Sequence, residues 1–292
     1  MSRFKPAHIL SYKLHIFFKK IIEKSKYFKN INIDENYISF IHGRESCIKI
    51  KKDKWLSIKG CGWQIGPPTV YYSKKDPLYF GILDTGRAKR EFQVSKHLNS
   101  KFKNVFAKCV DIVEYDVSKI QNEFKIKLPK SYLPCVLIRI VKSPYRLEDI
   151  AIMHKKNFAK VSFQKKFGFG YSGIVKFQKK LLNNILKYHS IGCVNDTLEW
   201  NNITTYGEII DLELFHHPKI YSRKSITKIN YNLKFRIEKE VIYFIEIIYR
   251  LGEILGFNLT LKDISESSYN MITKKNKDLS FSKILLKISK MK

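Results

Sequence analysis

The pattern of hydrophobic and polar residues changes about half-way along the chain. Alternation of apolar and polar residues over 37–60 predicts strands, with a hairpin turn at 52–54. A continuous apolar run over 135–141 predicts a buried strand. Beyond it, apolar residues recur at helical spacing, most clearly over 235–255. Strands followed by helices are typical of an α+β fold rather than a doubly wound sheet.

Weaker signals complete this pattern. Helices are expected over 9–29 and 173–189, and another is expected to begin at Asp84 or Thr85, either of which can cap it. Further strands are expected over four segments: 70–72, 78–83, 105–113 and 124–128. The tail, 271–292, alternates Ile or Leu with Lys. A basic amphipathic helix and a frayed end are alternatives for this tail.

Composition is that of a folded chain with an unusual charge. The 292 residues suffice for one large domain or two modest lobes, and 20 Phe and 17 Tyr supply core material. The net charge is +29, which either attracts an anionic partner such as nucleic acid, lipid or polyphosphate, or only solvates the surface. Lysines are spread over the whole length. Their spread favours the second interpretation, with a local ligand effect added at the site.

Cysteine spacing and hydropathy indicate the compartment. The cysteines are odd in number and contain no C-x-x-C pair: Cys47, Cys61, Cys109, Cys135 and Cys193. This pattern argues against a disulfide framework and a structural zinc site, and it fits a reducing compartment. No apolar stretch reaches the ~18 residues of a spanning helix. We therefore expect a cytoplasmic protein without a membrane span.

Several residues suit the binding of nucleotide phosphates. Lys59 ends an alternating strand and is followed by Gly60 and Gly62, beside which a phosphate can approach the backbone. Glu91 follows on the predicted helix and can hold the lysine. Each residue alone has an ordinary alternative as a solvated side chain. Arg139 leaves a buried strand, where its charge needs a partner.

For the arginines, phosphate is one partner that fits the guanidinium fork, and Arg146 follows on the same segment as Arg139. A structural carboxylate, Glu148 or Asp149, is the alternative. The segment 195–211 reads as a polar loop and short hairpin with Asn202 and Asp211 at its two ends. Their side-chain oxygens suit Mg²⁺, although a plain surface hairpin has the same pattern.

Two further motifs carry little weight. Residues 168–173 match G-x-G-x-x-G, but no βαβ context surrounds them, which favours a turn and helix start. The pair His216-His217 lacks the partner cluster that a metal site needs.

Taken together, these segments resemble the selenoprotein O family, the kinase-like protein adenylyltransferases. The resemblance covers roughly residues 55–213 and concerns the family's Leu-Lys-Gly-x-Gly, Gly-Arg-Ala, Arg-Glu-Tyr/Phe-Leu, Ser-Glu-Ala-Met and Arg-Val-Ala-x-Ser-x-x-Arg motifs and its metal-binding Asn and Asp. The matching blocks, in the family's order, are Ile58-Lys59-Gly60-Cys61-Gly62, Gly86-Arg87-Ala88 with Arg90-Glu91-Phe92 and Ser95-Lys96-His97-Leu98, Arg139-Ile140-Val141-Lys142-Ser143-Pro144-Tyr145-Arg146, and Asn202 with Asp211.

The resemblance implies a protein-kinase-like, two-lobed fold, with a strand-rich N-lobe over 1–141 and a helical C-lobe over 142–292 that carries the metal loop. It also implies ATP and Mg²⁺ as cofactors, with ATP bound in a flipped pose and AMP moved onto protein hydroxyls. Asn202 and Asp211 would hold Mg²⁺. The implied nucleotide-binding residues are Lys59, Gly60, Gly62, Arg87, Glu91, Arg139 and Arg146.

The chain departs from the family at the base. Asn201 stands where the family has an Asp, and an amide cannot accept the proton. Asp196 or Glu199 are substitutes at this catalytic position, or the base is missing. The chain is also much shorter than family members, has an insertion over 65–83, and lacks their C-terminal redox cysteine.

The sequence therefore supports a lead hypothesis and alternatives. The lead is transfer of AMP to a hydroxyl of a protein or small molecule, with phosphoryl transfer as the second enzyme hypothesis. Because of Asn201, a nucleotide-binding module without turnover is a further alternative. A weaker one is nucleic-acid binding through the Lys-rich surface, which would be strongly salt-dependent.

Overall fold

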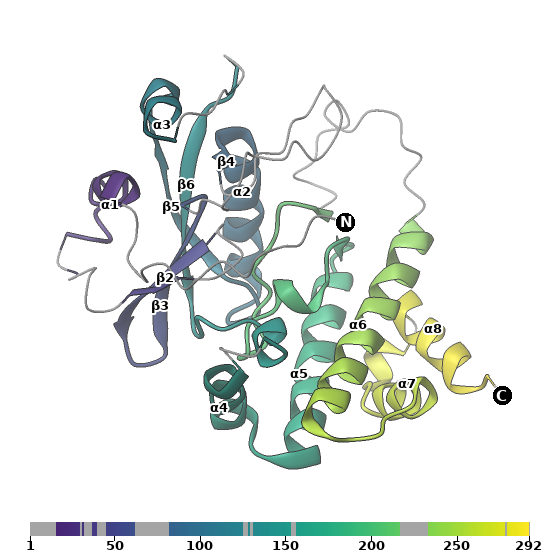
Figure 1. Cartoon of the computed structure of the whole chain (residues 1–292). Helices are drawn as coiled ribbons and strands as arrows, with labels where there is room; N and C mark the ends of the chain where they lie inside the picture. The colour runs from purple at the N-terminus through teal and green to yellow at the C-terminus, as the bar shows by residue number, and fades with distance from the viewer. Residues whose placement is uncertain are drawn as a thin grey trace, which may run out of the picture. The chain divides into compact units, whose positions relative to one another are not determined.

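The chain forms two compact units of mixed α+β structure (Figure 1). The first unit contains the described residues up to Phe92 together with Lys108–Pro144, and the second contains Gln93–Ala107 and the residues from Tyr145 onward. This division falls close to the expected boundary after residue 141, but it assigns 93–107 to the second unit. The computed structural model describes residues 16–29, 31, 37–39, 45–61, 82–124, 128, 131–152, 156–216, 233–277 and 279–291.

An antiparallel sheet forms the centre of the first unit. Its strands follow the order β1-β2-β3-β6-β4, and β5 also pairs with β6. The predicted hairpin and buried strand are confirmed, with Asp53 at φ 53° in the hairpin turn. The strand expected over 105–113 begins later, at Lys108. The strands are β1 (Tyr37–Ser39), β2 (Glu45–Lys51), β3 (Lys54–Lys59), β4 (Leu83–Asp84), β5 (Lys108–Glu114) and β6 (Pro134–Val141).

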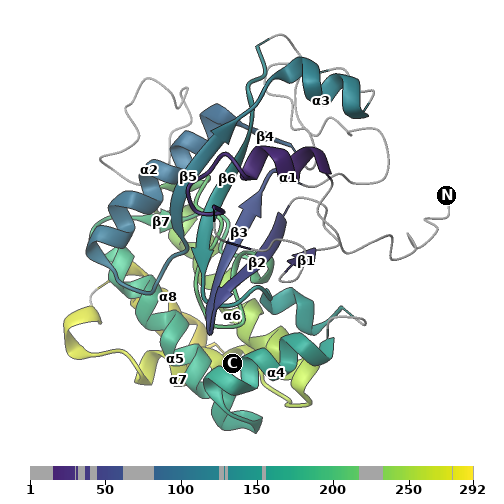
Figure 2. The ribbon, with the colours of Figure 1, turned by 90° about the vertical axis from the view of Figure 1, so that its left-hand side faces the viewer.

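Helices cover both faces of this sheet. Helices α1 (Ile16–Ile22) and α3 (Val117–Phe124) pack on one face, in front of the sheet in Figure 2. Helix α2 (Thr85–Lys101) packs its first part on the other face. As expected, α2 starts beside Asp84, whose carboxylate accepts a hydrogen bond of 2.8 Å from the Gly86 amide.

Two predictions for this unit were wrong. The helix expected over 9–29 ends at Ile22 because turns follow it, and residues up to 15 lie outside the described part. Phe124 ends a helix rather than starting a strand, because Ile120 turns inward to the α1 side of the sheet. The strands expected at 70–72 and 78–83 lie outside the described residues except at Ile82 and Leu83, and Leu83 begins β4.

The alternation along β6 decides what each face contains. Val136 and Ile138 join the cluster with α1 and α3, whereas Cys135 and Leu137 pack with α2. Because side chains alternate between faces with a period of two, Arg139 lies on the α2 side. This placement brings a buried charge under the helix that carries Glu91.

The second unit is mainly helical. The helices predicted over 173–189 and 235–255 are confirmed as α5 and α6, and Gly168 and Gly170 form the predicted turn and helix start, with φ of 92° and 62°. Helices α4 and α7 were not predicted, and only part of the 271–292 tail is helical. The elements are η1 (Leu147–Ile150), α4 (Lys156–Phe167), α5 (Gly170–His189), β7 (Val194–Asn195), η2 (Trp200–Asn202), β8 (Phe215–His216), α6 (Leu233–Leu255), α7 (Leu261–Asn270), η3 (Lys274–Asn276) and α8 (Ser280–Ser289).

The core of this unit lies between α5, α6 and α8. Phe177 and Leu181 of α5, Phe244 of α6 and Phe281 of α8 are completely buried. These residues belong to one apolar cluster that also includes Ile203 and other residues of the loop after β7. The core thus supports that loop from below.

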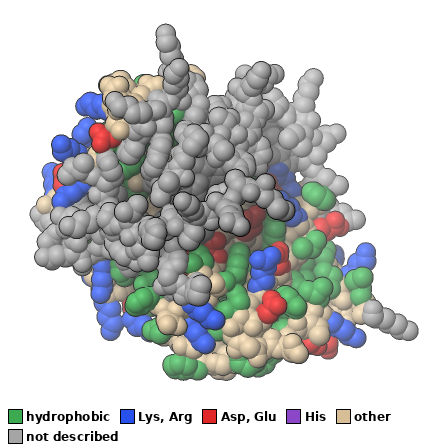
Figure 3. All heavy atoms as spheres, in the orientation of Figure 1, with side chains coloured by type: hydrophobic (Ala, Val, Ile, Leu, Met, Phe, Trp, Pro, Cys, Tyr) green, Lys and Arg blue, Asp and Glu red, His purple; other side chains and the backbone are tan. Residues whose placement is uncertain are grey.

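Surface and thiol properties agree with the composition. Lys and Arg side chains are scattered over the visible described surface in Figure 3, between apolar and acidic ones. All five cysteines are buried free thiols, and burial raises the pKa of Cys61, Cys135 and Cys193 to about 12 each. Within the described part of the chain, no helix combines the length and apolar character needed to cross a bilayer.

Candidate functional site

Lys59 and Glu91 meet inside the first unit, as predicted. Lys59 is the last residue of β3, and Glu91 lies two turns into α2, which packs on that face of the sheet. The Lys59 ammonium nitrogen is 2.8 Å from Oε2 of Glu91. The Glu91 side chain is 1% exposed, whereas that of Lys59 is 13% exposed. The pair therefore has a buried anion and a cation that still reaches the surface.

Arg139 completes this buried network. Its guanidinium donates 2.9 Å and 2.7 Å bonds to Glu91 and Glu45, and its Nε donates to Ser57. The sheet register explains this, because Ser57 pairs with Arg139 and Glu45 pairs with Lys59. All four strand residues share the α2 face.

The buried charge of Arg139 is compensated by carboxylates of the same unit. Arg139 pairs with the carboxylates of Glu45 and Glu91, whereas Glu148 or Asp149 was the structural carboxylate named as the alternative to phosphate. Two cations and two carboxylates balance, so the desolvated charges are compensated. A direct contact of Arg139 with phosphate stays a prediction, and its observed contacts hold Glu91 in place.

The remaining predicted phosphate residues differ in what the structure shows. Gly60 has φ 89°, and a Cβ there would lie 2.7 Å from Leu83 Cβ and 2.8 Å from the Cys135 carbonyl oxygen, so close packing alone requires glycine. Arg87 lies half-buried in the first turn of α2. Gly62 lies outside the described residues.

The predicted hairpin after Asn202 is confirmed in the second unit. Ile203 and Ile209 form an antiparallel bridge, and the Ile210 amide donates a 2.9 Å bond to the Asn202 carbonyl. Gly207, at φ 73°, makes the turn. Asn202 and Asp211 therefore lie at neighbouring positions on the two open ends of one hairpin.

Both ends of this hairpin offer oxygen atoms. The Asn202 amide nitrogen donates a 3.0 Å bond to the Thr197 carbonyl, which fixes the orientation of the amide and leaves its oxygen as the acceptor. One Asp211 oxygen accepts from the Glu213 amide at 3.3 Å. Such hard ligands fit Mg²⁺, which is usually held by one or two protein groups plus phosphates. No cluster of three or more His, Cys, Asp or Glu suited to a metal occurs among the residues that the structure describes.

Arg146 supports the polar loop. Its guanidinium donates a 2.9 Å bond to the Asn201 carbonyl, and its own amide donates to Asp149 at 2.7 Å. The following Leu147 amide bonds to the Ile203 carbonyl at 2.9 Å. Arg146 therefore positions the backbone beside Asn202.

Asp196 is engaged by a cation on α6. One of its oxygens pairs with Arg236, and the other is buried without a hydrogen-bond partner within the described part of the chain. Burial raises the pKa of Asp196, against the lowering effect of Arg236. A partly buried carboxylate with a raised pKa is a usual feature of a general base, and an orienting arginine fits the same role.

Sequence reasoning missed Glu240. This fully buried carboxylate on α6 accepts hydrogen bonds from the Tyr188 hydroxyl, the His189 ring and, at 3.1 Å, the Asn195 amide. It therefore joins α5, α6 and the start of the polar loop. The sequence signal that could have revealed Glu240 is an acidic residue within the apolar stripe of the helix predicted over 235–255.

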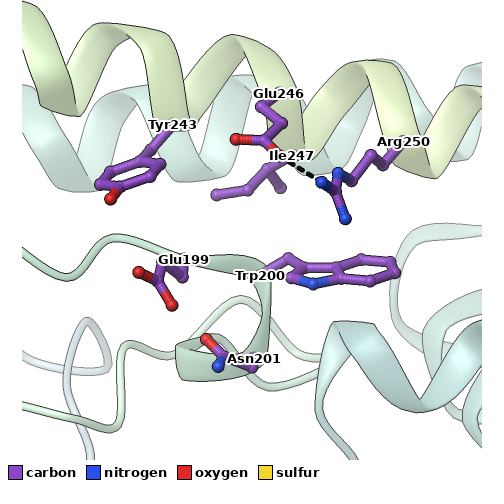
Figure 4. Close-up of a pocket in the computed structure, with 7 residues that line it drawn as sticks. All are labelled: Glu199, Trp200, Asn201, Tyr243, Glu246, Ile247 and Arg250. Carbon is purple, nitrogen blue, oxygen red and sulfur yellow. Dashed lines mark ion pairs between the residues drawn. The ribbon is translucent and has the colours of Figure 1, made fainter. Parts of the chain in front are cut away.

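A cavity of about 240 Å³ between α6 and the turn at Glu199 was also missed. Figure 4 shows the turn below and one face of α6 above. The sequence signal that could have indicated it is the spacing of the α6 residues at i, i+3, i+4 and i+7, which places them on one face of the helix. Its lining residues are Glu199, Trp200, Asn201, Tyr243, Glu246, Ile247 and Arg250.

Neither a protein-family model nor a curated protein matches this chain. The resemblance to the selenoprotein O family therefore depends on the residues and spacings themselves.

Proposed function

We propose that this chain is a Mg-ATP-dependent transferase of kinase-like, two-lobed fold that moves AMP onto a hydroxyl of a protein or small molecule. The observation that carries the proposal is the Lys59–Glu91 ion pair of 2.8 Å between the end of a strand and a helix on the same face of the sheet. Phosphotransferases of the kinase type use a lysine held in this way on the nucleotide phosphates.

The first set of residues would bind the phosphates. Glu91 fixes the Lys59 ammonium, and Arg139 in turn fixes Glu91. A lysine whose position is fixed before the ligand arrives loses less conformational entropy on binding. Arg87 would add charge at the start of α2.

The second set of residues would hold Mg²⁺. Asn202 and Asp211 provide two oxygen ligands from neighbouring backbone positions, and the phosphates would provide others. When bound, the metal neutralises charge on the phosphates. Arg146 would keep the loop in position through the Asn201 carbonyl.

In the proposed step the acceptor oxygen attacks the α-phosphorus of ATP. The bond from this phosphorus to the α,β-bridging oxygen breaks, and pyrophosphate leaves with that electron pair. The hydroxyl proton passes to a carboxylate, for which Asp196 is the candidate because its pKa is raised and Arg236 orients it. Glu199 is the other carboxylate of the same loop.

A second candidate is nucleotide binding without turnover. It is favoured by Asn201, which cannot take a proton, and by the pairing of Asp196 with Arg236, which ties up one oxygen of the other candidate base. Under this alternative Asp196 has a structural role only.

Labelled ATP separates these functions. Incubation with α-labelled and γ-labelled ATP should transfer only the α-label to an acceptor, and Asp196→Asn and Asp211→Asn should abolish it. Glu253→Gln, an exposed acid on α6, is the matched control. Transfer of the γ-label alone would make the protein a kinase. ATP binding without transfer of either label would support the second candidate, nucleotide binding without turnover.

A further inference from the structure

We propose that the cavity under α6 binds a guanidinium group, the side chain of an arginine on a protein segment. Tyr243, Ile247 and Arg250 of α6 form the upper wall, and Trp200 and the neighbouring residues of the turn form the lower wall (Figure 4). About 240 Å³ accommodates one side chain rather than a whole nucleotide.

The cavity contains acceptors that lack donors. The Glu199 carboxylate has no ion-pair or hydrogen-bond partner among the described residues. The Asn201 Oδ1 atom is buried and also has no partner in that part of the chain. A buried acceptor without a donor is costly, so a ligand rich in N–H groups would satisfy the Asn201 oxygen and also pair with the half-buried Glu199 carboxylate.

The aromatic walls of the cavity already contact cations. The Arg250 guanidinium lies 5.2 Å from the centre of the Trp200 ring, and Lys239 lies 5.2 Å from the centre of the Tyr243 ring. Both rings therefore already hold cations of the chain itself. Arg250 is neutralised by Glu246 at 2.5 Å, shown as the dashed line in Figure 4.

That pairing leaves Glu199 as the carboxylate available to a ligand. A planar guanidinium can donate two parallel hydrogen bonds to it and keep a further N–H for Asn201, which a lysine ammonium cannot do in one plane.

The overall charge makes such binding local. At a net charge of +29, the protein repels cations at long range, so an arginine would bind only through the cavity. Nucleic acid would fit the surface charge but would bring no donor-rich cation to Glu199.

The position of the cavity suggests its use, and this step rests on the proposed function. Glu199 and Asn201 belong to the turn that carries Asn202, the candidate metal ligand. A bound arginine would hold a nearby hydroxyl of the same segment at this loop. The acceptor class is therefore a protein segment with an arginine near its Ser, Thr or Tyr.

The test titrates the whole chain, without nucleotide, with Nα-acetyl-arginine amide and with the citrulline analogue, which has the same shape and no charge. Binding is followed by NMR and by tryptophan fluorescence, to which Trp200 contributes together with Trp55 and Trp63. We expect a Kd on the order of 1 mM for the arginine probe and at least tenfold weaker binding of the citrulline probe. Equal binding of both probes, or binding of neither, would overturn the proposal.

Variants localise the effect. Glu199→Gln should weaken the arginine probe about tenfold, whereas Glu253→Gln on the same helix as Arg250 should not change it. Unchanged affinity in Glu199→Gln also contradicts the proposal. Because no ATP is present, failure of AMP transfer would not affect this result. In a transfer assay, recognition predicts a raised KM for arginine-containing acceptors in Glu199→Gln, whereas a base role for Glu199 predicts a lowered kcat.

Discussion

Lys59 and Glu91 are 32 residues apart in the chain, yet the Lys59 ammonium lies 2.8 Å from the Glu91 carboxylate. Glu91 also accepts a bond from Arg139, so it stays paired when Lys59 is removed. Lys59→Met should therefore fold normally and bind ATP at least tenfold more weakly, because a charge-assisted contact with phosphate is lost. Calorimetric titration with Mg-ATP measures the change.

The matched control for this variant is Lys89→Met. Lys89 pairs with Glu114 at 3.1 Å, but its side chain is 61% exposed. Its loss should leave both stability and ATP affinity unchanged within error, since exposed ion pairs contribute little. Equal ATP affinity of Lys59→Met and Lys89→Met would exclude the proposed phosphate role.

Arg139 should matter for stability more than any surface cation. Arg139→Met leaves Glu45 and Glu91 buried with one charge partner fewer, and we expect a loss of about 3–5 kcal/mol in the free energy of unfolding. Urea unfolding measures it, with Lys89→Met as the reference. A loss under about 1 kcal/mol would mean that the network relaxes easily.

Two glycines allow a controlled test of packing. Gly60 and Gly256 have similar φ values of 89° and 84°, but of these two only Gly60 has neighbouring atoms within 3 Å of the position that an added Cβ would take. Gly256→Ala should cost about 1–2 kcal/mol from backbone strain alone. Gly60→Ala should cost a further ~1–3 kcal/mol, because Leu83 and Cys135 must move. Equal losses in the free energy of unfolding for the two variants would show that β4 and β6 move apart easily enough to accommodate the added methyl group.

Glu240 should hold the start of the polar loop. Glu240→Gln replaces an acceptor of three hydrogen bonds by an amide, and we expect a loss of about 1–3 kcal/mol. Hydrogen exchange at the Asn195 amide should accelerate in parallel, since that amide donates to Glu240. Glu253→Gln is the surface control, and unchanged exchange at Asn195 would contradict the positioning role.

His216 should make stability depend on pH. Burial lowers the pKa of His216, Arg236 lowers it further, and Asp196 acts in the opposite direction. With the folded pKa below the ordinary 6.5, the unfolded chain binds the proton more readily. The contribution of neutral His216 to the free energy of unfolding is therefore complete above about pH 6.5. It is lost as the pH falls through the folded pKa. The free energy of unfolding in urea, measured from pH 7.5 to 5.5, should depend less on pH in His216→Gln than in the unchanged protein. The same dependence on pH in both proteins would show that His216 is not its source.

Local patterns predicted much of the fold and part of the site. Lys59 and Glu91 were found because a strand of clear alternation precedes a well-capped helix. Asn202 and Asp211 were found because the hairpin between them is local in sequence. By contrast, Glu45 became a partner of Arg139 only through the pairing of β2 with β3 and β3 with β6, which no short pattern encodes.

The missed helices have physical reasons. Helix α4 buries Phe163 and Phe167 but exposes Phe158 and Val161, so its apolar stripe is blurred. Over residues 117–123, the part of α3 whose side-chain burial the structure describes, Ile120 alone is completely buried. The cavity was missed, although Glu199 and Asn201 were named, because Glu199 and Tyr243 come from segments far apart in sequence, and only the packing of α6 on the turn brings them together.

The buried thiols give the chain its own reporters of motion. A thiol with a pKa of about 12 is almost entirely protonated at neutral pH and hardly reacts with alkylating reagents while buried. Four cysteines lie in the first unit, and Cys193 lies in the second. The rate at which each thiol becomes reactive therefore records how often its own unit opens, without any introduced label.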